Sequence, residues 1–396
     1  MTSNHTQALG GITVLSFEHA IAAPLCSRQL ADLGARVIKI ERPDGGDFAR
    51  HYDQRAKGQS SHFIWTNRGK QSLSLNFKSA EATGIIRRLL ERSDVLLQNL
   101  APGVIERLGL SWQTLHSEYP GLIHCSISGY GDSGPFAGRK AYDLLIQAES
   151  GFLSVTGNQA GPVKAGISIA DIAAGTQAHS AILAALIKRQ KSGLGSEINI
   201  SMLEAMVEWM GFPLYYAWDG QQAPAPLGSD HASIYPYGSF SCADGQQLII
   251  GIQNEREWQN FCSQVLGTAE LAEHPDYANN PARSNNRQSL KARIDQVLSR
   301  LDSETVASRL DRAAIAWARV NDLQSVWNHP QLQALQKFTE IQTPNGPIQS
   351  FLPPGQVSLP EAARQVPSLG QHNEPLLQEL GYSPQEIRQL QESGCI

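Results

Sequence analysis

Short apolar runs alternate with stretches of helical spacing along the first half of the chain. The pattern begins with an apolar run, continues with a helical stretch that ends at Gly34, and returns to a second apolar run. The same order then recurs along the chain. It predicts strands at residues 12–17, 35–40, 72–76, 95–98, 122–128 and 197–200, and helices at residues 25–33 and 81–92. Strands and helices that alternate in this way form a parallel sheet covered on both faces. We therefore expect an open, parallel-sheet α/β fold.

The pattern changes after residue 200. An apolar, aromatic helix is predicted from Met202 to Trp218, and residues 219–230 are rich in Gly, Pro, Gln and Ala without periodicity. Beyond them, an Asp244-Gly245 turn between two short apolar runs predicts a β-hairpin, and helical spacing follows. We expect a large α/β domain over residues 1–200 completed by residues 330–396, a linker at 201–230 and a small α+β domain at 231–325.

Composition and charge narrow the function classes. A chain of 396 residues is long enough for two cores, because single cores stop growing near roughly 250–300 residues. The net charge of −5 argues against a general binder of nucleic acid or membrane surfaces, which needs an excess of Lys and Arg. The five cysteines show no C-x-x-C spacing, the polar start has no hydrophobic leader core, and no apolar run reaches the roughly 18–20 residues of a membrane span. We expect a cytoplasmic protein with a small-molecule partner.

Asp171 stands where a strand-like apolar run, residues 163–170, meets a helical pattern over residues 172–190. A carboxylate at such a junction lies over the free N–H groups of the first helical turn, which hold it ionised and aim it. That is the setting of a nucleophile, and equally that of an ordinary helix cap. Position alone leaves both interpretations open.

Strand ends and the turns that follow them offer further candidate chemistry. The first turn, residues 19–24, has small residues but no G-x-G-x-x-G, so a nicotinamide dinucleotide is not expected; an ordinary strand-to-helix loop is the alternative. Four cations near strand ends or loops either hold a multi-phosphate ligand together or remain solvated surface charges: Lys39, Arg42, Lys78 and Arg107.

A glycine-dense loop over residues 130–138 precedes Lys140 and Tyr142. Such a loop could close over a thioester, with Asp143 acting as a second carboxylate or only as the cap of the next helix. The sequence has no H-E-x-x-H, Walker or EF-hand pattern, so we predict no metal site.

Several segments, in order along the chain, resemble family III CoA-transferases, the CaiB/BaiF or formyl-CoA transferase-like family. They are residues 11–15, 31–43, 67–72, 98–103, 128–135 and 369–372. In that family the nucleophile is an aspartate that follows Tyr-Asp, Gln-Ala and Ser-Gly pairs; here Tyr142-Asp143, Gln147-Ala148 and Ser150-Gly151 precede Asp171. The resemblance implies a Rossmann-like large domain, an interlocked, ring-like homodimer, and Asp171 as the catalytic residue.

The resemblance also implies that coenzyme A and acyl-CoA bind as substrates, with no tightly bound cofactor. The family's contacts with coenzyme A carry over to Ile21, Ala22, Arg42, Leu75, Asn76, Lys78, Asn99, Leu100, Ala101, Arg107, Lys140 and Tyr142. Formyl-CoA-type members have Gln at the position of Ile21, which argues against formyl and oxalyl substrates.

Residues 231–237 resemble a stretch of members that act on dicarboxylates. The expected reaction is reversible transfer of CoA, from succinyl-CoA to a short dicarboxylate such as itaconate or mesaconate, through an aspartyl mixed anhydride and an aspartyl-CoA thioester. Arg50, Arg68 and His231 are candidates to pair with the distal carboxylate of the acceptor.

Two alternatives remain. The 2-methylacyl-CoA racemases share the fold but use a His where this chain has Tyr142, and a tyrosine, with a reference pKa of ~10, is poorly suited to removing and returning an α-proton. A non-catalytic CoA-binding protein is the other alternative, against which the presence of Asp171 argues.

Overall fold

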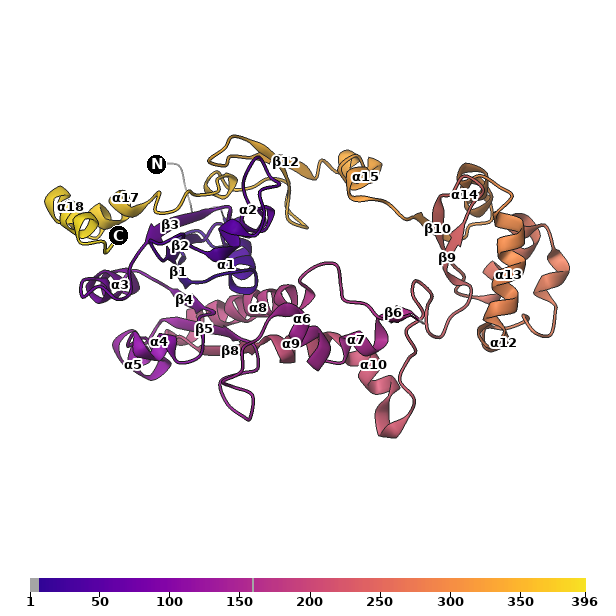
Figure 1. Cartoon of the computed structure of the whole chain (residues 1–396), viewed down its shortest axis with the longest axis horizontal. Helices are drawn as coiled ribbons and strands as arrows, with labels where there is room; N and C mark the ends of the chain where they lie inside the picture. The colour runs from indigo at the N-terminus through magenta and orange to yellow at the C-terminus, as the bar shows by residue number, and fades with distance from the viewer. Residues whose placement is uncertain (1–6, 159) are drawn as a thin grey trace. The chain divides into compact units, whose positions relative to one another are not determined.

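The computed structural model describes residues 7–158 and 160–396, which form two compact units (Figure 1). Unit 1 contains the described residues up to Phe152, together with 165–212 and 331–396; unit 2 contains those of 153–164 and 213–330. Three short helices lie where the chain passes between units: α7 (Phe152–Val155), α10 (Gly211–Tyr216) and α16 (Pro330–Ala334).

A six-stranded parallel sheet in the order β3-β2-β1-β4-β5-β8 forms the centre of unit 1. Its strands are β1 (Thr13–Phe17), β2 (Arg36–Glu41), β3 (Lys70–Ser74), β4 (Val95–Gln98), β5 (Ile123–Ser128) and β8 (Glu197–Ser201). The central strands β1 and β4 are buried almost throughout, because helices cover both faces of the sheet. The predicted parallel α/β sheet is confirmed, and the bounds of β4 are those predicted.

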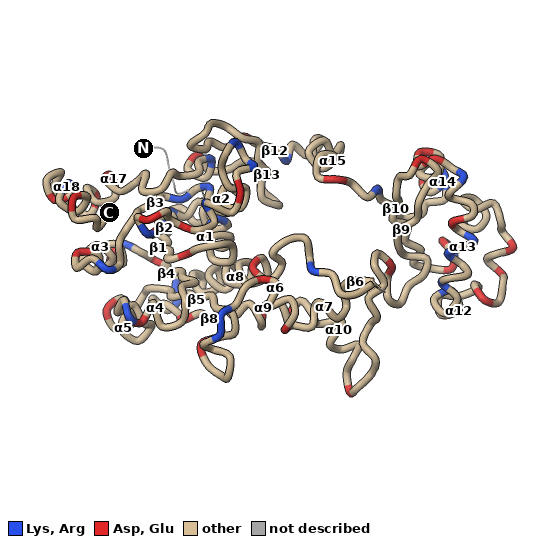
Figure 2. The backbone as a smooth tube through the Cα atoms, in the orientation of Figure 1, with Lys and Arg blue, Asp and Glu red and all other residues tan. Residues whose placement is uncertain are grey.

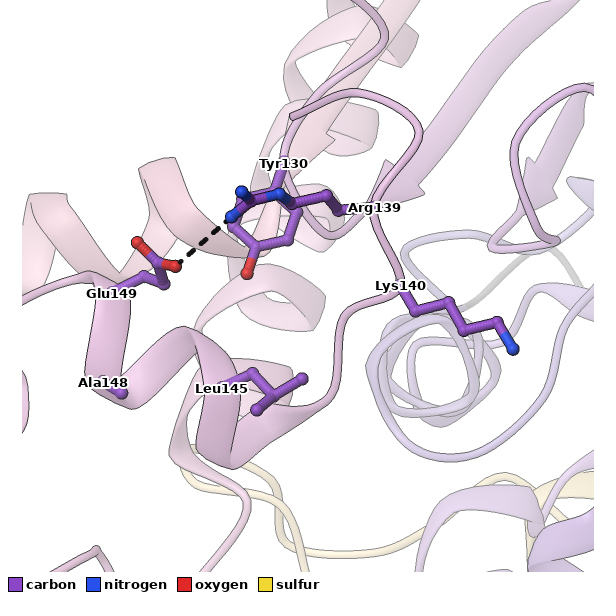
Figure 3. A pocket seen from close by; sticks show the side chains of 6 residues that line it. All are labelled: Tyr130, Arg139, Lys140, Leu145, Ala148 and Glu149. Carbon is purple, nitrogen blue, oxygen red and sulfur yellow. Dashed lines mark ion pairs between the residues drawn. The ribbon is translucent and has the colours of Figure 1, made fainter. Parts of the chain in front are cut away.

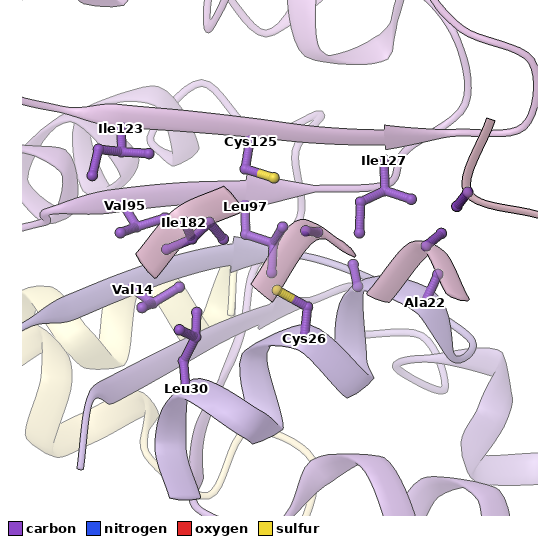
Figure 4. Packing of buried hydrophobic residues seen from close by; sticks show 14 of the residues in the cluster. Val14, Ala22, Cys26, Leu30, Val95, Leu97, Ile123, Cys125, Ile127 and Ile182 are labelled. Atoms are coloured by element: carbon purple, nitrogen blue, oxygen red, sulfur yellow. The ribbon is translucent and has the colours of Figure 1, made fainter. Parts of the chain in front are cut away.

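Helices cover the sheet in two layers. α1 and α8 pack on one face around side chains such as Val14, Leu97 and Cys125 (Figure 4), and α3, α17 and α18 pack on the other. The bounds are α1 (Ala22–Asp32), η2 (Phe48–His51), α2 (Ser61–Asn67), α3 (Ala82–Leu90), α4 (Val104–Arg107), α5 (Trp112–Glu118), α6 (Asp143–Glu149), α8 (Ile169–Ser192), α9 (Met202–Trp209), β12 (Phe338–Ile341), β13 (Ile348–Phe351), η6 (Ala362–Arg364), α17 (Asn373–Glu379) and α18 (Pro384–Glu392).

Two predicted elements differ from the structure. The run 163–170 is not a strand: its first residues have no regular structure, and helix α8 begins at Ile169. The sheet position beside β5 is taken by β8, and side chains of α6 bind the backbone of this segment instead. The helix predicted from Met202 to Trp218 is interrupted between α9 and α10, because Pro213 has no N–H to continue the ladder.

Among the described residues, α8 is the one helix long and apolar enough to cross a membrane by length and composition. The sequence pattern does not predict this, because Gln177, His179 and Ser180 interrupt its apolar residues. Its buried side chains, among them Ala174 and Ile182, belong to the core between α1 and the sheet. Packing on the sheet accounts for the apolar character of this helix.

Unit 2 is a small α+β unit with its own core around Trp258, Phe261 and Phe240. The predicted hairpin is confirmed, with Asp244-Gly245 between β9 and β10. Its elements are β6 (Gly157–Asn158), β7 (Gly161–Pro162), η3 (Trp218–Gly220), β9 (Tyr237–Ser241), β10 (Gln247–Gly251), α11 (Glu255–Asn260), η4 (Phe261–Leu266), η5 (Ala269–Ala272), α12 (Asn280–Asn285), α13 (Arg287–Leu298), α14 (Ser303–Arg312), β11 (Ala316–Arg319) and α15 (Leu323–Trp327).

Candidate active site

The chain changes direction across the sheet between β1 and β4. It builds β2 and β3 on one side of β1 and then returns to place β4, β5 and β8 on the other. In an open parallel sheet, the carboxyl ends of strands at such a point form a crevice where ligands bind. Here the turns after the two strands are joined: Asn99 Nδ2 donates to His19 O at 2.9 Å, and Asn99 Oδ1 accepts from His19 N at 3.0 Å. The side chain of Asn99 therefore holds the β1–α1 turn in place.

Ala20, in the same turn, has a φ of 61°, in the left-handed region that favours glycine. Its N–H donates to Asp47 Oδ1 at 3.1 Å, and Lys39 Nζ donates to the other oxygen of Asp47 at 2.8 Å. Such backbone conformations persist only where their surroundings fix them. Asp47 is thus one of the groups that fix the turn leading into α1.

A buried ion network lies beneath this turn, among the basic and acidic positions near β2 and β3 in Figure 2. Lys70 Nζ lies 2.6 Å from Glu18 Oε1, Lys39 Nζ lies 3.4 Å from the same oxygen, and all three side chains are fully buried. Burial alone would raise the pKa of Glu18, but Lys70 and Lys39 hold it well below its ordinary range. Lys39 is therefore an internal ion-pair partner, and its interpretation as a phosphate ligand is wrong.

Gly175 allows α8 to approach the start of α1. A Cβ at this position would lie 2.5 Å from the carbonyl oxygen of Ala22, so any side chain would force the two helices apart. Ala173, Ala174 and Ala178 are fully buried in the same interface. Small residues thus bring the first turn of α8 against the N-terminus of α1.

Asp171 is the third residue of α8 and is half-buried. Burial and the charge of Asp143 together raise the pKa of its carboxyl to about 7, and the backbone of Ala22, at the start of α1, opposes this shift. The cap of α8 is a different carboxylate, because Asp143 Oδ1 accepts from Ala170 N at 2.8 Å. Asp171 therefore does not cap its own helix and is only partly ionised near neutral pH.

Three aromatic side chains form a row that ends at Tyr52, which interacts electrostatically with Asp171. The rings of His19 and Phe48 are 4.9 Å apart, and those of Phe48 and Tyr52 are 5.8 Å apart. Burial raises the pKa of Tyr52 to about 12, and the nearby groups Asp47, Asp171 and Tyr142 contribute smaller increases. Tyr52 thus senses both Asp171 and Tyr142, and both tyrosine side chains are exposed.

A cavity of about 540 Å³ lies between the glycine-dense loop and α6, lined by Tyr130, Arg139, Lys140, Leu145, Ala148 and Glu149 (Figure 3). Arg139 NH1 lies 3.8 Å from Glu149 Oε1, and its guanidinium lies 3.6 Å from the ring centroid of Phe136. The side chain of Lys140 points away from this pair. Arg139 therefore ties the loop to α6 and leaves the Lys140 amine exposed.

Most of the residues predicted to contact coenzyme A follow the carboxyl ends of the parallel strands β1 to β4, whereas Arg107 lies in α4, and Lys140 and Tyr142 lie at the end of the long loop between β5 and α6. Their surroundings differ. The side chains of Ile21, Ala22 and Leu75 are buried, so only their backbone atoms remain for a ligand. Asn76, Asn99 and Leu100 are partly buried, and the remaining six residues are exposed: Arg42, Lys78, Ala101, Arg107, Lys140 and Tyr142. The side chain of Arg42 also donates to Gly46 O.

The three side chains predicted to pair with the distal carboxylate of the acceptor already form hydrogen bonds with other groups of this chain. Arg50 donates to both oxygens of Glu41 at 2.9 and 2.8 Å, and Arg68 donates to both oxygens of Asp32 at 3.0 and 2.9 Å. His231, in unit 2, accepts the N–H groups of Ser233 and Ile234 on Nδ1 and stacks on Tyr237. These contacts give the three side chains structural roles.

Sequence reasoning missed Asp47, Tyr52 and Gly175. Asp47 has a weak signal, because it ends an Asp-Gly-Gly-Asp turn after a predicted strand. Gly175 and Tyr52 have none, since their partners lie far away in sequence.

The model of the family described as CoA-transferase family III matches residues 9–373. Succinyl-CoA:glutarate CoA-transferase of Homo sapiens is 30% identical over 410 residues, covering 99% of this chain and 91% of that protein. Succinyl-CoA:mesaconate CoA-transferase of Haloarcula marismortui is 32% identical, covering 94% and 96%. The crystal structure of a CAIB/BAIF family protein from Brucella suis has a TM-score of 0.84 at 30% identity, covering 94% of this chain and 99% of that one. The chain belongs to CoA-transferase family III and is a CoA-transferase.

Proposed function

We propose that this enzyme reversibly transfers CoA from succinyl-CoA to a short dicarboxylic acid such as itaconate or mesaconate, with Asp171 as nucleophile. The observation that carries the proposal is the position of Asp171, half-buried in the first turn of α8, where the backbone of Ala22 at the start of α1 favours its ionised form. The two relatives named for succinyl-CoA with glutarate or mesaconate support the substrate class.

The proposed mechanism is a covalent relay. The ionised Asp171 carboxylate attacks the thioester carbonyl of the donor and expels CoA thiolate, which leaves a mixed anhydride on the enzyme. The thiolate attacks the aspartyl carbonyl, frees the donor acid and forms an aspartyl-CoA thioester. The acceptor carboxylate then attacks this thioester, and the released thiolate attacks the acceptor's carbonyl, which yields the new acyl-CoA and restores Asp171.

The N-terminus of α1 supports these steps electrostatically. Each attack on the aspartyl carbonyl creates an oxyanion, and a fixed backbone donor such as Ala22 N–H stabilises negative charge at that oxygen. The exposed cations Arg42, Lys78 and Arg107, at the same edge of the sheet, suit the phosphates of CoA.

The reaction is tested by mass spectrometry of a panel of acyl-CoA donors against short mono- and dicarboxylic acids. We expect new acyl-CoA only when both substrates are present, with the highest rate for succinyl-CoA and a dicarboxylate. Asp171→Asn should abolish transfer and keep most of the CoA affinity. A racemase would instead exchange the α-proton of a 2-methylacyl-CoA with deuterium from solvent without any acceptor, and that result would overturn the proposal.

We also propose an interlocked homodimer in the cytoplasm. Residues 207–218 carry a dense run of exposed apolar side chains, including Tyr215 at 80% and Trp218 at 72%, and such patches mark protein interfaces. All five cysteines are buried and unpaired, which supports a reducing compartment.

A further inference from the structure

We infer that Asp143 and Gln147 are positioning residues for Asp171, an inference that rests on the proposed nucleophilic role of Asp171. Both side chains come from α6. Asp143 Oδ1 accepts the Ala170 N–H at 2.8 Å, and Gln147 Oε1 accepts the Ala165 N–H at 2.9 Å. Gln147 Nε2 donates to Asp143 Oδ2 at 2.7 Å and joins the two contacts into one unit, the α6 bracket.

The α6 bracket holds both ends of the segment that leads into α8. This segment forms no strand, and Ser168, at the start of α8, makes no side-chain capping bond. The peptide N–H that Asp143 accepts belongs to Ala170, the residue directly before Asp171. The bracket therefore fixes the backbone from which the nucleophile projects, while Ala22 faces the carboxylate from α1.

The donor pattern explains why position 143 carries a carboxylate. Two N–H donors, from Ala170 and Gln147, point at its two oxygens, and only a carboxylate accepts on both. An amide there would turn a donor toward the Gln147 amide. Gln147 is fully buried, so water does not relieve such a clash.

This pattern also has an electrostatic consequence for Asp171. A second carboxylate beside the proposed nucleophile disfavours its ionisation; Tyr52, after η2, is a further titratable group that interacts with Asp171. Capping of α8 alone does not need that charge, because an amide oxygen at position 143 accepts the Ala170 N–H equally well. The carboxylate is needed to join the cap to Gln147.

Reversing the hydrogen bond inside the bracket tests this inference. Asp143→Asn alone places an amide N–H against the Gln147 amide N–H. The double variant D143N/Q147E reverses the bond between the two side chains, keeps an oxygen acceptor for each of the Ala170 and Ala165 N–H groups, and keeps the net charge. We expect kcat of D143N to fall about 10- to 100-fold with a smaller change in KM, and kcat of the double variant to return to within about fivefold of wild type.

Hydrogen exchange at the amides of Ala165 and Ala170 supplies a readout independent of activity. Exchange should be slow in the wild type and in Asp171→Asn, faster in D143N and slow again in the double variant, with melting temperatures confirming that each variant is folded. Wild-type kcat in D143N, or a double variant with slow exchange but the low kcat of D143N, would overturn the inference. Absence of transfer by the wild type would instead refute the proposed function, and the exchange pattern would still test the bracket.

Discussion

At the scale of single residues, opposing forces act on one carboxylate. Burial and Asp143 disfavour the charge of Asp171, whereas the Ala22 N–H favours it, and the resulting pKa is about 7. A less stabilised carboxylate is a stronger nucleophile when ionised, because its charge is incompletely neutralised by its surroundings. The environment of Asp171 therefore lowers its ionised fraction, and the proposed role predicts that the fraction which ionises is more reactive.

This balance predicts a pH dependence. In the proposed mechanism Asp171 attacks only as the carboxylate, so its active fraction should be low below its pKa of about 7 and should approach completeness above it. The kcat/KM of CoA transfer, measured from pH 5.5 to 9, should rise with an inflection near 7. In D143N the loss of a neighbouring charge should move the inflection to lower pH. A flat wild-type profile would contradict the assignment of Asp171 as nucleophile.

A second prediction at this scale concerns the buried pair Lys39–Asp47. Lys39→Met leaves Asp47 and Glu18 short of a cation in a buried setting, and should lower the free energy of unfolding by about 3–5 kcal/mol. The control is Lys291→Met, which breaks a half-exposed pair with Asp295 at 3.1 Å and should cost about 0–1 kcal/mol. Equal costs in urea unfolding would show that the buried network does not stabilise the turn.

At the scale of elements, the contact between α1 and α8 sets the geometry of the site. Gly175 lies one helical turn after Asp171 on the same side of α8. The close approach of α8 to α1 that Gly175 permits therefore also brings Asp171 toward α1. The Ala22 N–H then faces Asp171 from the adjoining helix. Close helix packing thereby places the proposed nucleophile near the N-terminus of α1.

Gly175→Ala tests this contact. The added Cβ would lie 2.5 Å from Ala22 O, so the helices must separate; we expect a loss of about 1–3 kcal/mol in unfolding free energy and a fall in kcat of about tenfold or more. The matched control is Gly84→Ala in α3, where a Cβ meets no atom within 4 Å and helix propensity favours Ala. If both variants keep wild-type kcat, close packing at Gly175 does not position Asp171.

A comparison of β4 with the run 163–170 shows which elements can be predicted from the sequence. Buried parallel strands such as β4 are predictable, because they appear as continuous apolar runs between turns. The run 163–170 looks the same in sequence, but its amides bind α6 side chains, and periodicity carries no information about such partners. Asp171 stands out by position and by resemblance, whereas the hold of Asn99 on His19 joins residues 80 positions apart and becomes visible only in the fold.

At the scale of the whole molecule, the proposed homodimer gives a role to the exposed apolar run at residues 207–218. Light scattering after size exclusion should give twice the mass of the chain. Tyr215→Glu, which places a charge at an 80% exposed ring, should shift the population toward monomer without lowering the melting temperature of the fold. A monomeric wild type at micromolar concentration would contradict the dimer.

The central claim, that Asp171 carries the transferred group, has a direct test. The enzyme is mixed with succinyl-CoA without acceptor, treated with hydroxylamine and digested for peptide mass spectrometry. We predict a hydroxamate on Asp171 that requires acyl-CoA and is missing when Asp171→Asn is treated in the same way. Transfer-competent enzyme that shows no modification of Asp171, or modification at another residue, would contradict the account.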